Sequence, residues 1–365
     1  MQQLKKVIVF LLIIQPVLGY SQKKLSKHEK HEVIKRIKEL IDVNYVFADK
    51  AKLINNSIDS LDLSGKYNSI KDYKAFADVL TNDLVAVSKD KHFEIQYRPE
   101  LIKSRREWRK RQEERENNEE TEEQEEETDL NLWYAQKENF GFEKVEILDG
   151  NIGYIKLNFF HFLEWVKPTI DASMRFVAST DALIIDLREN GGGYRSDSYI
   201  GSYFFDEKPI IWNISYDRYE DKTENIYTYE KIDGDRYLNK PVYLLVGEKS
   251  FSRAEGFAYC MKHFKKAIVV GQTTPGAAHG INFLEMNDNF LIQLPVVHNI
   301  HPVTKTDWEG IGVIPQIITS KEQSFKVAYT QALDTLIADK KDKVLGVHYD
   351  RLKKKYKEIK EKINN

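Results

Sequence analysis

The stretch from Pro241 to Gly280 limits the possible folds of the chain most. Its sequence is PVYLLVGEKSFSRAEGFAYCMKHFKKAIVVGQTTPGAAHG. PVYLLVG is a short apolar run rich in β-forming residues, which is typical of a strand buried on both faces. A helical pattern follows, in which Ala254, Phe257 and Met261 share an apolar face. IVVG is a second buried strand, and a glycine-rich loop comes after it. The stretch therefore predicts a strand–turn–helix–strand unit of an α/β protein.

Ser252 stands at the start of the helix in this unit. Backbone N–H groups lack partners at a helix N-terminus, and the helix dipole favours negative charge there. The position therefore suits a nucleophile whose reaction builds an oxyanion. Ser252 and Glu255 also fit the capping box S-x-x-E, in which the two residues satisfy each other's backbone N–H groups. This stretch alone leaves both interpretations open.

The length of 365 residues allows a full hydrophobic core and two domains. An apolar content of 41% is ordinary for a globular protein, and a formal charge of -2 gives no general case for nucleic-acid binding. Cys260 is the only cysteine, so an internal disulfide is excluded. We interpret it as a small buried apolar side chain.

Residues 1–21 have the pattern of a secretory signal peptide. Two lysines precede an apolar core from Val7 to Ile14, and cleavage is expected after Gly19 or Ser21. The apolar run is too short for a membrane span, and no later stretch approaches spanning length. We therefore expect an exported protein, periplasmic or secreted, with no stable membrane span after cleavage.

Residues 22–100 are predicted to form a helical N-terminal domain. Apolar residues recur at helical spacing over Ser26–Phe47 and Asp72–Ser88. The alternation from His92 to Tyr97 predicts a strand that leaves a turn, with His92 at its beginning.

Residues 101–135 are predicted to be a charged insertion or linker. Basic residues dominate the first half of Leu101–Asp129, and glutamate dominates the second half. Because the segment offers nothing from which a core could be built, we expect a solvated helix or a disordered insertion. A docking segment for a partner is the alternative.

Residues 136–320 are predicted to form an α/β domain with a largely buried sheet, and 321–365 to form a closing helix and a basic tail. The buried strand Ala182–Leu187 ends in a loop that contains Gly191–Gly193. The loop thus lies at a strand's carboxyl end, where α/β proteins place their sites. Its glycines allow backbone N–H groups to approach a ligand, although a simple tight turn is the alternative.

Four segments, in order, carry a resemblance to a known family: SKDKHFEI, ALIIDLRENGGG, SFSRAEGFA with AIVVGQTTPGAAHG, and WEGIGVIPQI. The chain resembles the family S41 serine peptidases, which include tail-specific proteases, tricorn-core proteases and the retinoid-binding interphotoreceptor modules. The resemblance spans about Val87 to Ile318. It implies a ClpP/crotonase-like α/β spiral with a small helical N-terminal domain.

The resemblance also implies roles for single residues, with Ser252 matching the family nucleophile. The tail-specific branch has a lysine base in the loop after the next strand, but Gln272–His279 contains no lysine. In the tricorn and interphotoreceptor branch the base is a histidine in a motif like DKHFEI, which His92 matches. That branch also uses a glutamate before G-V-x-P, which Glu309 matches. Lys91 stands where tricorn proteases have a serine, which leaves a fourth member of the relay open.

These residue types suit hydrolysis of an acyl bond. A serine hydroxyl is a weak nucleophile, and a neutral imidazole can take its proton during the attack. Glu309 would fix the imidazole tautomer, and the N–H groups of Arg253 and of Gly192 or Gly193 would form the oxyanion hole. The scheme needs no metal and no organic cofactor.

The sequence thus predicts an exported serine endopeptidase that acts on peptides or unfolded protein segments. One alternative is a catalytically inactive module of the same family that binds an apolar ligand or a peptide. Another is an interaction protein built around the charged insertion. His279, His298 and His301 are further candidates for residues that line a substrate cleft.

Overall fold

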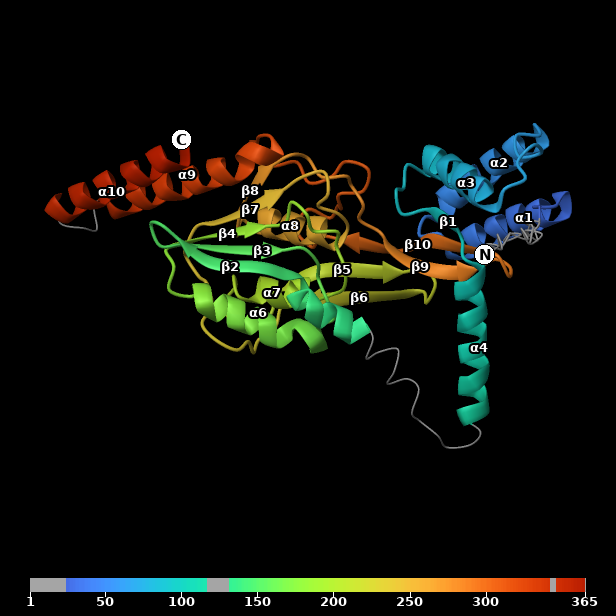
Figure 1. The fold of residues 1–365 in the computed structure, drawn as a ribbon, viewed down its shortest axis with the longest axis horizontal. Coiled ribbons are helices and arrows are strands. Elements are labelled where there is room, and N and C mark those ends of the chain that lie inside the picture. Colours follow the sequence, from blue (N-terminus) through green and yellow to red (C-terminus); the bar gives the residue numbers. More distant parts are fainter. Residues whose placement is uncertain (1–23, 117–130, 342–345, 365) are drawn as a thin grey trace, which may run out of the picture.

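The computed structural model describes residues 24–116, 131–341 and 346–364. The predicted signal peptide and the glutamate-rich half of the charged insertion lie outside these ranges. Figure 1 shows a mixed α/β structure with a helical N-terminal region at one end. This architecture confirms the predicted fold class.

Three helices form the N-terminal region: α1 (Lys27–Asn44), α2 (Ala48–Leu63) and α3 (Tyr73–Ser88). The side chains of Ser26 and Asp72 cap α1 and α3 by accepting backbone N–H groups three residues further on, at 3.1 and 2.8 Å. The sequence predicted α1 and α3 and did not assign α2.

A six-stranded sheet forms the centre of the second region, in the order β11-β8-β7-β4-β3-β2. β2 and β3 are an antiparallel hairpin, and the other neighbouring strands run parallel. The strands are β2 (Phe142–Leu148), β3 (Ile152–Leu157), β4 (Ala182–Asp186), β7 (Val242–Val246), β8 (Ile268–Gly271) and β11 (Ile317–Ile318). The buried strands predicted at Ala182–Leu187 and within Pro241–Gly280 are present as β4, β7 and β8.

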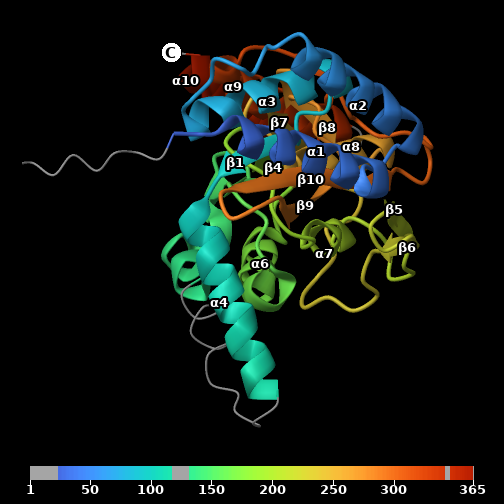
Figure 2. The same ribbon diagram turned by 90° about the vertical axis from the view of Figure 1, so that its right-hand side faces the viewer.

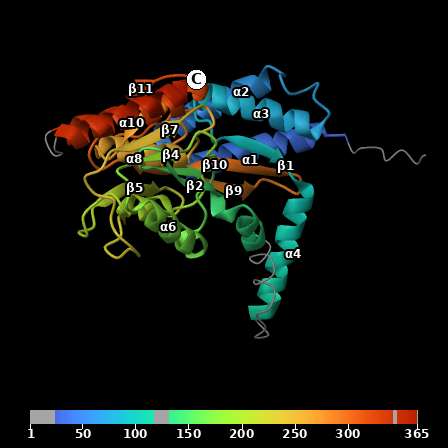
Figure 3. The same ribbon diagram turned by 60° about the vertical axis from the view of Figure 1, so that its left-hand side comes forward.

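Helices cover both faces of this sheet. Alternate residues of β3, β4 and β7 enter two separate cores, as the two-residue period of a strand requires. One face packs against α6 (Leu163–Val177), and α7 (Asp197–Ser202) and α8 (Arg253–His263) join the same core. The other face packs against α9 (Lys321–Lys340) and α10 (Gly346–Asn364), as Figure 3 shows from the side.

The prediction of a basic tail after the closing helix is wrong. Residues 346–364 form α10, which inserts Tyr356 and Ile359 into the core beneath α9. These two side chains are only 2% and 5% exposed, and the lysines lie around them on the helix. A lysine-rich composition concealed a narrow apolar stripe.

A second sheet joins the N-terminal helices to the rest of the chain, in the order β1-β10-β5-β6 with β9 against β10. Its strands are β1 (Glu94–Tyr97), β5 (Ile211–Asp217), β6 (Lys222–Tyr227), β9 (Gly280–Glu285) and β10 (Phe290–Ile300). The first half of β10 pairs with β1 and sends alternate residues into the core of the helical region, and its last residues pair with β5. Figure 2 shows α1 beside this strand.

Helix α4 (Pro99–Glu116) projects away from the two sheets (Figure 1). Arg106 and Arg109 pair with Glu285 on β9. These ion pairs hold the first half of α4 against the second sheet. Ile102 is 1% exposed, so the expectation that this segment contributes nothing to a core is wrong for its first turn. None of the helices in the described ranges is both long and apolar enough to cross a membrane.

Gly271→Ala should destabilise the fold strongly. Gly271 has φ +133°, and an added Cβ would lie 2.0 Å from the carbonyl oxygen of Val246 on the neighbouring strand. We expect the free energy of unfolding to fall by roughly 3 kcal/mol in urea denaturation. Gly247→Ala is the matched control, because its Cβ would approach no atom more closely than 3.8 Å. Equal stability of the two variants would contradict this account of the β7–β8 contact.

Candidate active site

Ser252 occupies a strained turn between β7 and α8. Its φ of 52° and ψ of -113° lie in a region that residues other than glycine rarely adopt. The backbone N–H of Ser252 donates to the Glu255 carboxylate at 2.8 Å, so the predicted capping box is present. Ser252 also lines a cavity. The two interpretations of the sequence are therefore compatible, since the cap leaves the residue at the cavity wall.

The triglycine loop packs directly against this turn. The N–H of Phe251 donates to the carbonyl oxygen of Asn190 at 3.0 Å. Gly192 has φ +102°, and an added Cβ would lie 2.9 Å from the Phe251 carbonyl oxygen and 3.0 Å from the Cβ of Ser252. Only glycine allows this approach, so the loop and the serine turn fix each other's position.

The backbone donors predicted for an oxyanion hole differ in their surroundings. The N–H of Gly192 donates to the side-chain oxygen of Asn190 at 2.9 Å. The N–H groups of Gly193 and Arg253 donate to no acceptor within the described ranges. Gly193 and Arg253 also line the cavity. Of the two glycines, Gly193 is the one whose N–H is available to a ligand.

Glu255 fixes the glycine-rich loop to the start of α8. Its side chain is fully buried, and besides Ser252 its carboxylate accepts hydrogen bonds from Thr274 Oγ1 at 2.6 Å, Gly276 N at 2.7 Å and Ala277 N at 3.0 Å. Burial raises the pKa of this carboxyl, although these donors work in the opposite direction. The sequence predicted that Glu255 caps the helix together with Ser252. It did not predict the hydrogen bonds between Glu255 and the glycine-rich loop.

His92 reaches the same cavity from the N-terminal region. Lys89 caps the C-terminus of helix α3, and its left-handed φ of 61° turns the chain toward β1. The ring of His92 packs 5.3 Å from the ring of Phe251, centroid to centroid, and is 3% exposed as a residue. His92 and Ser252 thus line one cavity although 160 residues separate them in sequence.

Asp90 is a site residue that the sequence analysis missed. It is 1% exposed, and its Oδ1 accepts the backbone N–H of His92 at 3.0 Å. The same Oδ1 lies 3.6 Å from His92 Nδ1, and Oδ2 lies 2.6 Å from His279 Nδ1. An aspartate two residues before a histidine at a turn is a recognisable signal, because Asp side chains commonly accept the N–H two residues on.

Glu309 lies in the same cluster but faces a different histidine. Its Oε2 accepts the backbone N–H of Ala278 at 2.6 Å and lies 3.5 Å from His279 Nδ1. Among the described residues it makes no ion pair with His92 within 4.0 Å. The structure therefore brings Ser252 and His92 to one cavity, and it places Glu309 behind His279.

Lys91, the departure from the tricorn pattern, points away from this cluster. Its exposed ammonium group donates to the carbonyl oxygen of Pro275 in the glycine-rich loop. Lys91 therefore links the turn that bears His92 to the loop that Glu255 holds.

His298 and His301 do not line the cavity. His298 Nε2 lies 2.7 Å from Asp307 Oδ2, and both partly buried side chains lie next to the buried His279. His301 is fully buried beside Tyr259, and burial lowers its pKa to about 4. We interpret His301 as a residue of the core.

Two sets of side chains in the described ranges bring potential metal ligands within 4.8 Å of one another. They are His279, His298 and Asp307, and Asp90, His279 and Glu309. Two short contacts within these sets, His279–Asp90 and His298–Asp307, already pair an imidazole with a carboxylate. The geometry therefore favours a hydrogen-bonded network over a metal site.

The cavity has a volume of about 750 Å³ and a largely apolar wall. The rings of Phe162 and Tyr194 stack on each other with centroids 3.5 Å apart, next to the triglycine loop. Other apolar residues that line it are Phe159, Phe251, Ile281, Phe283, Val297 and Trp308. A space of this size with an aromatic wall suits an extended peptide or another apolar ligand.

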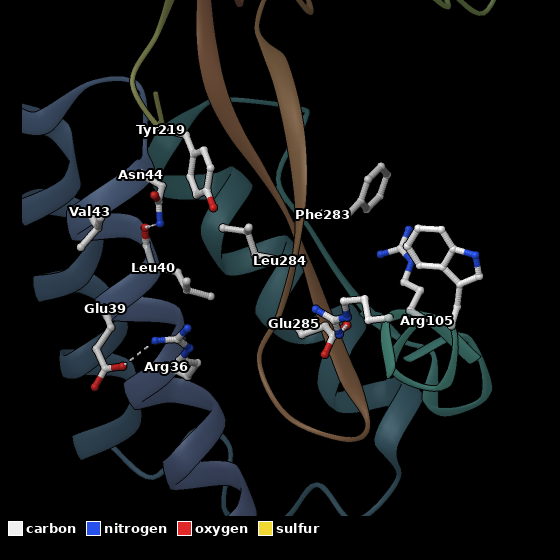
Figure 4. Close-up of a pocket in the computed structure, with 12 residues that line it drawn as sticks. Arg36, Glu39, Leu40, Val43, Asn44, Arg105, Tyr219, Phe283, Leu284 and Glu285 are labelled. Atoms are coloured by element: carbon white, nitrogen blue, oxygen red, sulfur yellow. Dashed lines mark hydrogen bonds and ion pairs between the residues drawn. The ribbon is translucent and has the colours of Figure 1, made fainter. Parts of the chain in front are cut away.

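A second hollow of about 870 Å³ lies between α1, α4 and β9 (Figure 4). Its lining mixes charged and apolar residues, and the charged pairs Arg36–Glu39 and Arg109–Glu285 neutralise one another. Phe283 lines both spaces, but neither Ser252 nor His92 lines this one. Of the two spaces, only the cavity around Ser252 is lined by the candidate nucleophile and the candidate base.

Two family models match the chain in order. The model described as "N-terminal domain of Peptidase_S41 in eukaryotic IRBP" matches residues 25–130. The model described as "Peptidase family S41" matches residues 151–319, which include the triglycine loop, Ser252 and Glu309. The chain belongs to peptidase family S41. The family resemblance that the sequence motifs carry is thereby confirmed.

Curated relatives match over about half of the chain at low identity. The tail-specific protease of Haemophilus influenzae is 28% identical over 205 residues, which is 51% of this chain and 28% of that protein. The carboxy-terminal processing protease CtpA of Bacillus subtilis is 26% identical over 190 residues, which is 51% of this chain and 39% of that protein. The chain therefore spans less than half the length of these S41 relatives.

Two solved structures resemble the chain over most of its length. One is a protein of Parabacteroides merdae described as a candidate peptidase, with a TM-score of 0.55, 18% identity and coverage of 87% of this chain and 99% of that one. The other is a lipoprotein of Streptococcus agalactiae, with a TM-score of 0.50, 14% identity and coverage of 84% and 96%. At these identities the likeness establishes the fold.

Glu255→Gln should destabilise the site. The amide can accept at one atom only, so buried N–H donors of the glycine-rich loop and of Ser252 lose their acceptor. We expect a loss of roughly 3 kcal/mol in the free energy of unfolding. Glu248→Gln is the control, because Glu248 is exposed and accepts one hydrogen bond of 3.3 Å. Urea denaturation of both variants measures the difference, and similar losses would disprove the anchoring role.

Proposed function

We propose that the chain is an exported serine endopeptidase that hydrolyses bonds in peptides or unfolded protein segments. Membership of family S41 supports peptide-bond hydrolysis. The observation that carries the proposal is the meeting of Ser252 and His92 at one cavity, from two regions of the chain. Export rests on the signal-like pattern of residues 1–21.

The reaction proceeds by nucleophilic attack. His92 takes the hydroxyl proton of Ser252 as Oγ bonds to the carbonyl carbon of the substrate. The N–H groups of Arg253 and Gly193 stabilise the oxyanion, and each such donor is commonly worth about 3 kcal/mol in the transition state. The imidazolium then protonates the leaving amine, and water hydrolyses the acyl-enzyme by the same path in reverse. Glu309 remains the family's match for the carboxylate of the relay.

A binding module for an apolar ligand is the second candidate. The aromatic wall of the cavity favours it, because such a space can hold an apolar molecule without any chemistry. Complete inertness of Ser252 together with saturable binding of an apolar ligand would select this function over hydrolysis.

Ser252→Ala should abolish reaction with a fluorophosphonate probe and lower kcat/KM for peptide cleavage at least about a thousandfold. His92→Gln should slow both processes to a similar degree, because the hydroxyl loses its base. The measurement is the labelling rate and the cleavage of a peptide mixture by purified protein. Ser64→Ala, at the end of α2 and outside the lining of the cavity, should behave as wild type. Unchanged cleavage by Ser252→Ala would remove the nucleophile from the proposal.

Tyr194→Ala should weaken selection for large apolar side chains next to the cleaved bond. The substitution removes one ring of the stacked pair at the cavity wall, and a ring of this size typically contributes about tenfold or more to such selection. Profiles of cleaved peptides for variant and wild type measure the change. Tyr227→Ala, which alters an exposed tyrosine on β6, is the control. An unchanged profile would place the specificity elsewhere.

A further inference from the structure

Asp90 lies at the centre of a buried group of ionisable side chains behind the cavity. Oδ2 of its carboxylate lies 2.6 Å from His279 Nδ1, and Oδ1 lies 3.6 Å from His92 Nδ1. Oδ1 also accepts the backbone N–H of His92 at 3.0 Å. Each oxygen thus faces a different imidazole.

We propose that Asp90 is the positioning residue of His92. Its carboxylate holds His92 as the tautomer protonated at Nδ1, which leaves Nε2 free to take the proton of Ser252, and His279 fixes the carboxylate from the other side. The inference rests on the proposed peptidase function for its kinetic consequence. The tautomer itself is a property of the protein without substrate.

Geometry favours Asp90 over Glu309 for this role. The Asp90 carboxylate is held close to His92 by the backbone bond, since only one residue separates the two in sequence. Oε2 of Glu309 is taken by the N–H of Ala278 and by the nearby His279 Nδ1. The 3.6 Å separation between Asp90 and His92 slightly exceeds a hydrogen bond, and such contacts commonly tighten when substrate binds.

The charge distribution agrees with this assignment. Burial alone would raise the pKa of Asp90, but the hydrogen bond from His279 and the nearby charges of His279 and His92 hold this pKa well below its ordinary value. Burial and the charge of Asp90 raise the pKa of Glu309. Asp90 is therefore the carboxyl of the two that stays ionised to lower pH. Burial opposes a charge on His279, yet its bond to Asp90 raises the pKa of this imidazole overall, so it acts as a donor.

The other groups around the cluster leave this arrangement intact. Tyr45, at the end of α1, has its pKa raised by burial and by the charge of Asp90, so it stays a neutral phenol. The ring of Phe47 packs against both His279 and His298, at 5.2 and 5.1 Å. His298 pairs with Asp307 at 2.7 Å, which keeps that second carboxylate away from His92.

The test is the protonation state of the His92 ring, observed by nitrogen NMR of protein labelled at histidine. His92→Gln identifies its signals among the nine histidines. We expect wild type to show the tautomer protonated at Nδ1 and Asp90→Asn to lose that preference. Glu309→Gln should shift the signals of His279 and leave the tautomer of His92 unchanged. Asp83→Asn removes another buried carboxylate, bound by Tyr67 in the helical region, and controls for general destabilisation.

Kinetics of the same variants supply a second readout. Asp90→Asn should lower kcat about a hundredfold or more, with KM within about threefold of wild type, as expected when a triad loses the carboxylate that orients its base. Glu309→Gln should cost less than about tenfold in kcat because it acts through His279. Asp83→Asn should retain wild-type kcat below its unfolding midpoint.

The outcomes separate the two proposals. If His92 has the expected tautomer and Asp90→Asn disturbs it while Ser252 never reacts with a fluorophosphonate, the peptidase function fails and the positioning role stands. A wild-type His92 protonated at Nε2 would overturn the positioning role, and this measurement does not require Asp90→Asn to fold. A larger disturbance of His92 by Glu309→Gln than by Asp90→Asn would also overturn it.

Discussion

Strand β10 holds the two sides of the candidate site in register. Its first half pairs with β1 and packs into the helical core, and its last residues pair with β5. Gln293 on this strand donates to the carbonyl oxygen of His92 at 2.8 Å, which ties the histidine turn to the strand directly. A slip of one residue would turn every apolar side chain of β10 to the opposite face, so burial fixes the register and with it the position of His92.

The serine turn depends on a different constraint, which is a buried carboxylate. Glu255 gathers donors from Ser252 and from the glycine-rich loop in a space that excludes water. Removing the acceptor would leave buried N–H groups unpaired, so the turn and the loop are stable together. The unusual backbone angles of Ser252 persist because these contacts and the triglycine loop determine them from several sides.

The two regions contribute differently to the chemistry. The family S41 match covers the serine turn and the triglycine loop, whereas His92 and Asp90 lie in the region that matches an N-terminal domain of the interphotoreceptor type. The loop after β8 contains no lysine, and the base of the proposed reaction, His92, comes from the N-terminal region. The structure brings the N-terminal turn to the cavity. Contacts such as the hydrogen bond from Lys91 to Pro275 hold this turn against the glycine-rich loop. The proposed hydrolytic site therefore draws on residues of both regions.

The sequence by itself determined the local elements and the identity of Ser252 and His92 as candidates. Buried strands, the cap at Ser252 and the triglycine loop follow from patterns within a few residues of each other, which propensity and periodicity can detect. Helix α2 was not predicted because its buried apolar stripe is narrow. The stripe consists of Ala51, Ile54 and Ile58. Only the tertiary structure decided that Asp90 meets His279 and that Glu309 lies next to the same imidazole. These residues are 189 and 30 positions from His279 in sequence, and the pairing of β10 with β1 and β5 connects the regions that carry them. No local pattern encodes such distances.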